Sequence, residues 1–328
     1  MNFEEEYARR DLDLEEALRL LDYTAYFDIR QIPQPFDACS IAGHLLKDEI
    51  LRRQGNGLYA ITRPGAILLA KRLTDFPQLS RKALRIAQYR GNDRLHMLRD
   101  WTGKKGYAAG FEECMMYISA LLPAEQVIEG AMRIQRTAYP EQAVRELIVN
   151  ALIHQDFSIT GTGPVVEIFE GRVEISNLGT LLVDKSRIVD SKPCYRNAGT
   201  ASLMRSLGLC GQSGTGWAET VTACEADHIP APKIALYEKH TRVTLYQRIP
   251  FGSMTQDEKL RSCYLHACIR QIRGEQLTNA SLRARFGLKD TASGSISRLI
   301  RDAVQKNYIR PFDADTACRY RKYIPFGA

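Results

Sequence analysis

Arg145-Glu146-Leu147-Ile148-Val149-Asn150-Ala151-Leu152-Ile153-His154-Gln155-Asp156 is the stretch around which the chain is organised. Read as a helix, it places Glu146, Asn150 and His154 four residues apart, so their side chains form one polar ridge. Apolar residues flank the ridge, so we expect it to face the interior or a cleft. One interpretation is a core helix whose polar groups bond to a neighbouring loop. The other is a site in which the carboxylate polarises a water, the amide oxygen holds a metal and the imidazole lies near an anion.

Length and composition describe an ordinary globular protein. The 328 residues, 45% of them hydrophobic and 25% charged, allow two or three domains that each bury a core. No apolar run reaches membrane-spanning length, and the first residues are acidic where a signal peptide would be basic. We therefore expect a cytoplasmic protein without a membrane partner. The eight scattered cysteines form no metal-binding spacing, so we expect reduced thiols.

The positive charge is concentrated at the end of the chain. Residues 257–328 contain 14 Lys and Arg against 7 Asp and Glu, and this surplus equals the net charge of +7 of the whole chain. A basic segment on a neutral body suggests an attached module that binds a polyanion.

The first 75 residues are expected to form a helical, winged-helix-like region. The pattern predicts helices over 12–21, 36–53 and 66–72, with a short strand over 58–61 after a glycine-containing turn. The first helix is acidic, so we favour a packing or dimerisation role for this region over nucleic-acid binding.

Residues 76–252 are expected to form a two-layer α+β domain. A strand over 83–89 is followed by a polar loop over 91–110 and a helix over 111–122. After the helix that carries the ridge, strands are expected over 165–169, 172–176, 233–237 and 241–247, a set of four. A lid-like loop over 181–199 and helices over 200–207 and 217–226 separate the two pairs of strands. This order is typical of a sandwich with its helices on one face of the sheet.

Three motifs in this order carry a resemblance to a known fold. The ridge Glu146/Asn150/His154 is followed by Asn177-x-Gly179 and then by Gly214-Thr215-Gly216 at a helix start. The arrangement resembles the ATP-binding (Bergerat) fold of the GHKL proteins, which include gyrase B, Hsp90, histidine kinases and MutL. The residues of these motifs, together with Tyr139-Pro140 and Arg196-Asn197, are more similar to those of the RecG-like C-terminal ATPase domains. These commonly follow a Schlafen-type AlbA domain in proteins described as transcriptional regulators, and no such domain is expected in this chain.

The resemblance implies a role for each matching residue. Glu146 would be the catalytic acidic residue that orients the attacking water. The amide oxygen of Asn150 would coordinate Mg²⁺ that bridges the phosphates of ATP. The remaining residues expected to bind nucleotide are His154, Asn177, Gly179, Arg196, Gly214, Thr215 and Gly216.

Two departures from the family pattern bear on activity. The family has Asp where this chain has Asn177, so a hydrogen bond from the adenine amino group would lose its charge-assisted part, roughly 1 kcal/mol or more. The lid over 181–199 also lacks a glycine cluster. With no P-loop, a helicase motor is not expected.

Residues 253–328 are expected to form a winged helix-turn-helix. Helices over 257–274, 280–286 and 291–306 precede two strands over 308–312 and 319–324. In this plan the third helix enters the DNA major groove and the strands form the wing. The residues expected to contact DNA are Ser295, Arg298, Arg301, Arg319, Arg321 and Lys322. Alternatively, the module serves as a dimerisation or docking domain with solvated charges.

The sequence therefore predicts an ATP-binding regulatory protein in which a GHKL-like domain controls a DNA-binding winged helix. One alternative is a scaffold without nucleotide, with homodimerisation as its role. Another is a slow, Mg-dependent ATPase in DNA repair or phage defence.

Overall fold

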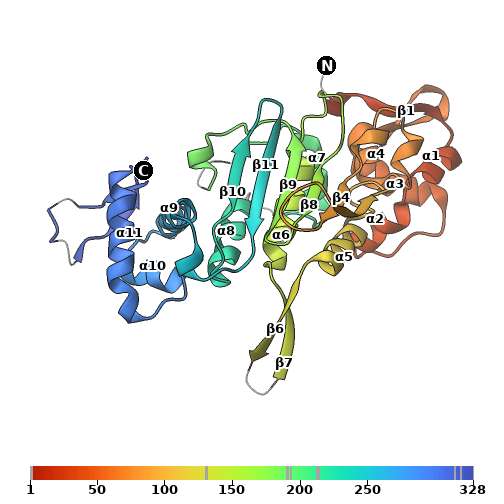
Figure 1. The fold of residues 1–328 in the computed structure, drawn as a ribbon. Coiled ribbons are helices and arrows are strands. Elements are labelled where there is room, and N and C mark those ends of the chain that lie inside the picture. The colour runs from red at the N-terminus through yellow and green to blue at the C-terminus, as the bar shows by residue number, and fades with distance from the viewer. Residues whose placement is uncertain are drawn as a thin grey trace.

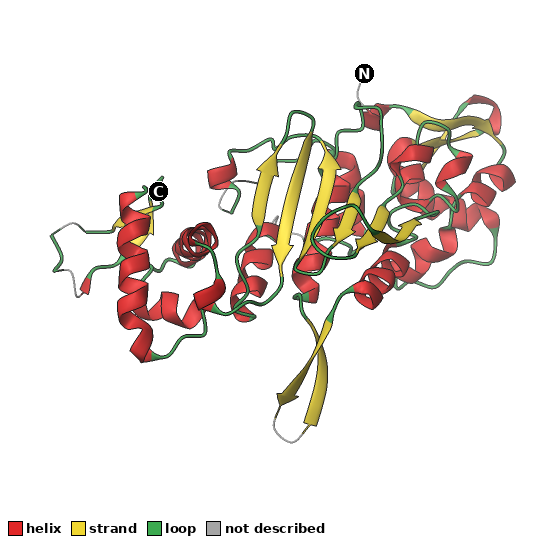
Figure 2. Cartoon of the chain, viewed as in Figure 1, coloured by secondary structure: helices red, strands yellow, loops and turns green. Residues whose placement is uncertain are grey.

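A computed structural model describes residues 3–129, 132–189, 192, 194–211, 215–313, 315–317 and 320–327. The elements form three parts in chain order, seen from right to left in Figure 1: a helical N-terminal part, a central mixed sheet and a helical C-terminal part. Figure 2 shows that the strands are concentrated in the centre and the helices at both ends. Among the described residues, the central part has the largest sheet, with six strands, and the other sheets have two or three.

The N-terminal part packs four helices around a small antiparallel sheet of order β1-β3-β2. Aspartate side chains fix three helix starts: Asp13, Asp22 and Asp37 each accept a hydrogen bond from a backbone N–H in the first turn. In order, the elements are β1 (Tyr7–Leu12), α1 (Leu14–Leu20), α2 (Tyr23–Arg30), α3 (Ala38–Lys47), β2 (Leu51–Arg53), β3 (Tyr59–Thr62) and α4 (Arg63–Leu69).

Two helix predictions for this part were wrong at their ends. The helix expected to start at Leu12 starts at Leu14, because Asp13 caps it and the preceding residues pair with β3 as β1. The helix expected to reach Arg53 ends at Lys47. Glu49 adopts a left-handed backbone with φ of 55°, and the chain then leaves as β2.

The central sheet has six strands in the order β10-β11-β9-β8-β4-β5. All neighbours are antiparallel except β4 and β8, which run parallel. Val166, Ile168, Val173 and Ile175 are at most 2% exposed and join the main core beneath the sheet. The strands are β4 (Arg85–Tyr89), β5 (Met97–Thr102), β8 (Val165–Ile168), β9 (Arg172–Leu178), β10 (Lys233–Leu236) and β11 (His240–Tyr246).

Helices of the central part lie against the sheet and against one another. The ridge helix α6 (Glu141–Ile153) packs on α8 (Gly216–Ala226) and on β9. The other helices are α5 (Phe111–Leu121) and α7 (Ala198–Ser206). One continuous core runs from Ala8 to Ile269, so the N-terminal helices and the central sheet share their buried interior.

The structure adds two features that the sequence did not predict. The stretch expected to be a loop over 91–110 contains β5, an edge strand whose side chains are mostly exposed and therefore show no apolar period. A hairpin of β6 (Ala124–Glu129) and β7 (Met132–Thr137) also projects from the body, as Figures 1 and 2 show.

The C-terminal part has three helices followed by a two-stranded antiparallel sheet. These are α9 (Gln256–Ile272), α10 (Asn279–Arg285), α11 (Ser293–Gln305), β12 (Ile309–Pro311) and β13 (Tyr323–Pro325). The predicted order of elements is confirmed here. Residues such as Leu260, Ile296 and Leu299 form a second core, separate from the main one. Along α9, however, Leu265 and Ile269 belong to the main core, so this helix joins the two parts.

Short 3-10 turns complete the described chain. They are Phe3–Glu5, Gly55–Gly57, Leu73–Asp75, Ser80–Lys82, Lys185–Arg187, Phe251–Ser253 and Asp290–Ala292. None of the helices in the described residues is long and apolar enough to cross a membrane.

Candidate functional site

The polar ridge of α6 faces a cavity of about 150 Å³ between α6, the sheet and the loop that follows β9. Glu146, Asn150 and His154 all line it, as the spacing of four residues requires on one helix face. Ile175 and Asn177 of β9 and Thr241 of β11 line it from the sheet. The ridge is therefore the wall of a cavity rather than a set of groups bonded to a neighbouring loop.

The carboxylate of Glu146 and the amide of Asn150 point toward the start of α8. A β-carbon built on Gly216 would fall 2.5 Å from Glu146 Oε2 and 3.5 Å from Asn150 Nδ2. Burial raises the pKa of Glu146, the charge of Glu219 adds to that rise, and Arg145 opposes it. Within the described parts of the chain, neither side chain has a hydrogen-bond or ion-pair partner. A carboxylate and an amide thus both lie beside Gly216 at the cavity wall, without a protein partner among the described residues.

These two groups fit a magnesium ion. A carboxylate and an amide oxygen are ligands that Mg²⁺ accepts, and the ion usually keeps several waters. The structure describes no cluster of three or more His, Cys, Asp or Glu side chains that could hold a metal by themselves. Waters and a phosphate ligand would complete the coordination sphere.

His154 closes the C-terminal end of the ridge. Burial, with a smaller contribution from the charge of Arg196, lowers the pKa of His154 below its usual value. The imidazole is therefore uncharged at neutral pH, and it contributes hydrogen bonding rather than positive charge toward an anion. Its ring stacks on Tyr195, with ring centroids 5.6 Å apart and planes 13° apart. This stacking ties the loop after β9 to the end of α6.

Asn177 lines the cavity from the second-to-last position of β9. Its Nδ2 donates to the carbonyl oxygen of Leu178 at 3.1 Å, which leaves Oδ1 as the group available for a ligand. Thr241 lies directly opposite Asn177 on β11 and also lines the cavity. The Thr241 hydroxyl donates to the carbonyl oxygen of Gly179 at 2.8 Å. Asn177 and Thr241 therefore form a polar pair at the sheet side of the cavity.

Gly179 supports the site without lining it. Its φ of +107° lies outside the range that suits other residues, and an added β-carbon would fall 3.1 Å from the backbone nitrogen of Asp156. The close approach lets Asp156 N donate to the carbonyl oxygen of Leu178 at 2.8 Å. Gly179 thus joins the end of β9 to the turn after α6.

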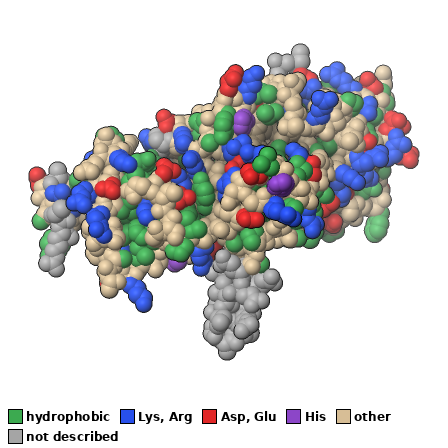
Figure 3. Space-filling view, in the orientation of Figure 1, with side chains coloured by type: hydrophobic (Ala, Val, Ile, Leu, Met, Phe, Trp, Pro, Cys, Tyr) green, Lys and Arg blue, Asp and Glu red, His purple; other side chains and the backbone are tan. Residues whose placement is uncertain are grey.

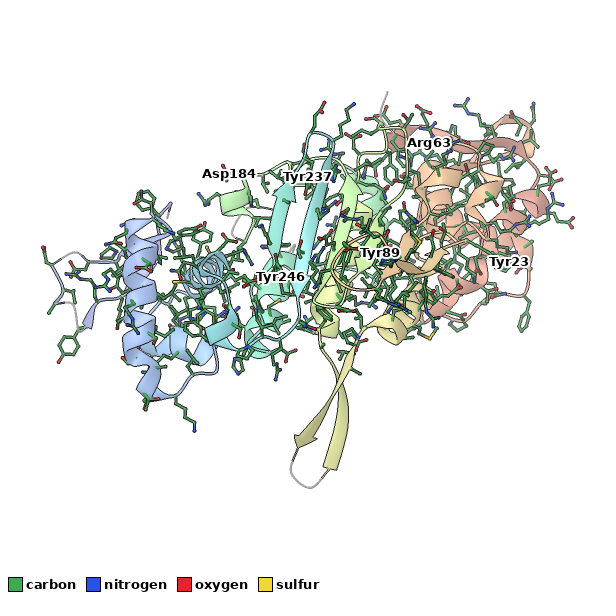
Figure 4. All side chains as sticks on the ribbon, viewed as in Figure 1. Tyr23, Arg63, Tyr89, Asp184, Tyr237 and Tyr246 are labelled. Atoms are coloured by element: carbon green, nitrogen blue, oxygen red, sulfur yellow. The ribbon has the colours of Figure 1, made fainter. Side chains whose placement is uncertain are left out.

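The loop from Thr180 to Asn197 covers one side of the cavity. Leu181, Leu182, Val183 and Ile188 line the cavity from this loop, so its cover is largely apolar. In Figure 4, Asp184 in this loop and Tyr237, just after β10, lie toward the same end of the sheet. Lys192 lines the cavity too, and it supplies the one Lys or Arg side chain among the described lining residues.

The far end of this loop is firmly anchored. Asn197 is buried and its Nδ2 donates to the carbonyl oxygens of Ile153 and Gln155, both at 2.8 Å, where α6 ends. Glu4 binds the start of α7, accepting from Gly199 N at 2.9 Å and Thr200 N at 2.6 Å. Movement of the loop is therefore restricted at its junction with α7.

Of the remaining residues predicted to bind nucleotide, two bond to protein groups and one is not described. Arg196 is bound to protein, with its guanidinium 3.3 Å from Asp156 Oδ2 and donating to Thr180 O at 3.1 Å, and it does not line the cavity. Thr215 precedes α8, and its hydroxyl donates to Glu219. Gly214 lies outside the described residues. Of the two predicted glycines within the described residues, Gly216 lines the cavity and Gly179 does not.

The residues predicted to contact DNA lie on the C-terminal part. Arg298 and Arg301 are exposed on α11, while Ile296, Leu299 and Ile300 face the core as predicted. Ser295 Oγ accepts a hydrogen bond from Arg298 at 3.3 Å.

The predicted wing residues are described in part. Lys322 is exposed, and Arg321 donates from Nε to the carbonyl oxygen of Thr316 at 3.1 Å. Arg319 lies outside the described residues. On the face drawn in Figure 3, Lys and Arg side chains lie at both ends of the molecule. The surplus of positive charge in residues 257–328 therefore does not confine the basic surface to the C-terminal part.

Comparisons with known proteins agree with the central domain. Residues 161–245 match the family described as "Putative ATP-dependent DNA helicase recG C-terminal". The match covers Asn177 and Gly216 but starts after α6, so it does not include Glu146 or Asn150. This part of the chain is thus similar to a RecG C-terminal-like ATPase domain.

The crystal structure of the DIP2311 protein from Corynebacterium diphtheriae is similar in fold, with a TM-score of 0.61 at 16% identity. The likeness covers 95% of this chain and 62% of that one, so this chain spans less than two thirds of its length. No protein with a curated description matches the chain.

Proposed function

We propose that the chain is an adenine-nucleotide-binding regulatory protein. In this proposal the central part is a divergent GHKL-like domain that binds ATP with Mg²⁺, and the C-terminal part is a winged helix that binds DNA. The observation that carries the proposal is the pair Glu146 and Asn150, which lines the cavity without a partner among the described residues. The RecG C-terminal-like match over 161–245 supports the same class of ligand.

Each wall of the cavity has a part in nucleotide binding. Asn177 and Thr241 offer polar groups at the sheet side for the adenine base, and the apolar loop over 181–188 covers it. Asn150 would coordinate Mg²⁺, which when bound neutralises phosphate charge, and Glu146 lies beside it at the cavity wall. Gly216 lets the N-terminus of α8 approach the phosphates, where helix amides favour an anion. Lys192 adds a positive charge from the loop.

A route for regulation runs along α8. This helix begins at Gly216, beside the cavity, and Glu225 in its last turn accepts a hydrogen bond from His266 of α9. A ligand that shifts α8 would therefore also shift the C-terminal helices, and the two binding equilibria would be coupled.

Calorimetric titration with ATP and Mg²⁺ tests the nucleotide half of the proposal. We expect saturable binding that Asn150→Ala weakens at least tenfold, about 1.4 kcal/mol. Gln142→Ala is the matched control, because Gln142 lies two turns earlier on α6, is exposed and does not line the cavity. Absence of binding at millimolar ATP would refute nucleotide binding and leave the scaffold interpretation.

Duplex DNA binding is tested separately. Arg298→Ala and Arg301→Ala should each weaken binding and lower its salt dependence, because each removes one phosphate or base contact. Lys239→Ala, which removes one exposed charge from the turn between β10 and β11, should leave the affinity unchanged. Equal effects of all three variants would indicate binding by net charge alone and would contradict the role of α11.

A slow ATPase is the second candidate function. Glu146 favours it, because a carboxylate with a raised pKa at the cavity wall can orient and deprotonate a water. Phosphate release that Glu146→Gln abolishes while ATP binding persists would establish hydrolysis. The Glu146 carboxylate has no partner among the described residues, which counts against a pure scaffold, for which we would expect a side chain bonded to protein groups.

A further inference from the structure

A second cavity, of about 470 Å³, lies between the loop after β9 and the C-terminal part. Tyr264 and Gln271 line it from one face of α9, and Asn307 and Tyr308 line it just beyond α11. Phe326, after β13, closes another side, and Arg187 reaches it from the 3-10 turn Lys185–Arg187. None of these residues belongs to the candidate nucleotide site or to the outward face of α11.

The lining has a specific chemical character. Three aromatic rings, two carboxamides and one guanidinium line the cavity, and no Asp or Glu is among its described lining residues. The Tyr264 and Tyr308 rings meet at an angle, with centroids 6.1 Å apart and planes 64° apart. Phe326 is 49% exposed, and its backbone N–H donates to Tyr308 O at 3.0 Å, which fixes the Phe326 backbone at the edge of the cavity. An exposed ring held in place by its backbone can act as a stacking surface.

We infer that this cavity takes an unstacked base of a single-stranded nucleic acid, with Arg187 on the adjoining phosphate. Bases stack on aromatic side chains without regard to sequence, while carboxamides can bond to base edges. The absence of Asp and Glu from the described lining and the surplus of 7 positive charges over 257–328 suit a polyanion. A proline-rich peptide could also use aromatic walls, but it would not require the guanidinium or the basic surroundings.

The inference deepens the DNA-binding half of the proposed function but does not depend on α11. It adds a site for a single strand beside the module proposed for duplex DNA. The location also has a consequence for regulation: Ile188 lines the nucleotide cavity and Arg187, the preceding residue, lines this one. One short turn thus separates the two cavities.

Fluorescence anisotropy with labelled 12-nucleotide oligo(dT) tests the inference on the full chain. Phe326→Ala and Arg187→Ala should each weaken binding by at least about fivefold, the low end of what losing one stacked base costs. Arg187→Ala should also lower the salt slope by about 0.7, the value for one phosphate contact on a single strand. Both side chains are exposed, so both variants should keep the wild-type melting temperature.

Matched controls exist for both variants. Phe312→Ala removes a ring that is 58% exposed in the same C-terminal part but outside the cavity, and Lys185→Ala removes a cation from the same 3-10 turn as Arg187. Each control should change the affinity less than twofold.

The outcomes separate this inference from the proposed function. Equal losses in the cavity variants and the controls, no oligo(dT) binding by the wild type, or binding of a proline-rich peptide in its place would each overturn the inference. Binding of oligo(dT) that depends on Phe326 and Arg187, in a protein that does not bind duplex DNA, would support the cavity site while contradicting the role of α11.

Discussion

Gly216 lies directly against Glu146, so close that a β-carbon on Gly216 would fall 2.5 Å from the Oε2 atom of that carboxylate. The first residue of α8 and the carboxylate of α6 therefore share one position at the cavity wall. A side chain at residue 216 would force either the helix start or the carboxylate to move.

Gly216→Ala should therefore weaken ATP binding by about tenfold or more, because the added methyl group displaces Glu146 and separates α8 from the phosphate position. Calorimetric titration with ATP and Mg²⁺ measures the change. Gly211→Ala is the matched control: Gly211 lines the same cavity, but its added β-carbon would meet Glu219 no closer than 3.9 Å. Comparable losses in the two variants would contradict a specific contact between Gly216 and Glu146.

The raised pKa of Glu146 predicts a pH-dependent stability difference. Because burial disfavours the ionised carboxylate in the folded state, the unfolded chain loses this proton first as the pH rises. The free energy of unfolding should then fall as the pH rises from the unfolded pKa of Glu146 through its higher folded pKa. Glu146→Gln removes this cost, so its melting temperature should match that of the wild type near pH 4 and exceed it at pH 7.

Thermal melts across that pH range measure the difference. Glu141→Gln serves as the control, because it removes an exposed carboxylate from the same helix and Glu141 does not line the cavity. A Glu146→Gln variant less stable than the wild type at pH 7 would mean that the ionised carboxylate has a stabilising partner.

The spacing within one helix made the first half of the site predictable. Glu146, Asn150 and His154 are separated by one turn each, and local periodicity alone places them on one wall. The burial pattern of α11 was predictable for the same reason. Gly216 could be singled out because a glycine at a helix start next to other glycines is a local signal.

The second half of the site depends on contacts between distant segments. Thr241 faces Asn177 through the register of β9 and β11, and nothing local to either strand reveals that pairing. Arg196 was predicted to bind nucleotide, yet its bond to Asp156 depends on how the loop folds back. The edge strand β5 was missed because its exposed side chains carry no apolar alternation, which is the signal that identifies a half-buried strand.

Asn177→Asp should strengthen binding of adenine nucleotides by about fivefold, because a carboxylate accepts the hydrogen bond of the adenine amino group more strongly, by about 1 kcal/mol. The lost donation to Leu178 O leaves no unsatisfied carbonyl, since Asp156 N also donates to that oxygen at 2.8 Å. Competition between ATP and GTP measures the selectivity. Weaker ATP binding, or an equal gain for GTP, would show that residue 177 does not contact adenine.

The open face of the sheet carries a buried charge network centred on Glu174. Arg94, Arg172 and Arg242 all contact this carboxylate, which is 6% exposed. Although burial favours protonation, the hydrogen bond from Arg172 and the charges of the three arginines hold the pKa of Glu174 below its usual value. This stabilisation is present above the unfolded pKa and is lost as the pH falls through the folded one.

Glu174→Ala should lower the free energy of unfolding by about 2 kcal/mol, because it removes a buried carboxylate that three partly exposed guanidinium groups share. Asp100→Ala is the control on the same sheet. The Asp100 side chain is 44% exposed and binds Arg85 at 2.8 Å, so the loss of this ion pair should cost about 0.5 kcal/mol. Denaturant unfolding at pH 7 measures both values. Similar losses in the two variants would show that burial does not strengthen the Glu174 network.

His266 offers the sharpest test of coupling between the nucleotide cavity and the C-terminal part. Its Nδ1 lies 3.0 Å from Glu225 Oε1 of α8, and its Nε2 lies 3.1 Å from Ser281 Oγ of α10. The ring is therefore a link between the helix that starts at the cavity and the helices that carry the proposed DNA surface. If ATP changes DNA affinity by a factor within the usual range of about 5 to 150, His266→Ala should reduce that factor to below about twofold.

The measurement is the ratio of DNA dissociation constants with and without ATP and Mg²⁺. Since His266→Ala also leaves the Glu225 carboxylate without this partner, a melt must confirm that the variant is folded, and His266→Gln should restore part of the ratio by replacing both hydrogen bonds. Arg273→Ala is the control, because its exposed bond to Thr222 at 3.4 Å crosses the same interface between α8 and α9. An unchanged ratio in folded His266→Ala would show that the signal, if one exists, travels by another route, such as the turn that carries Arg187.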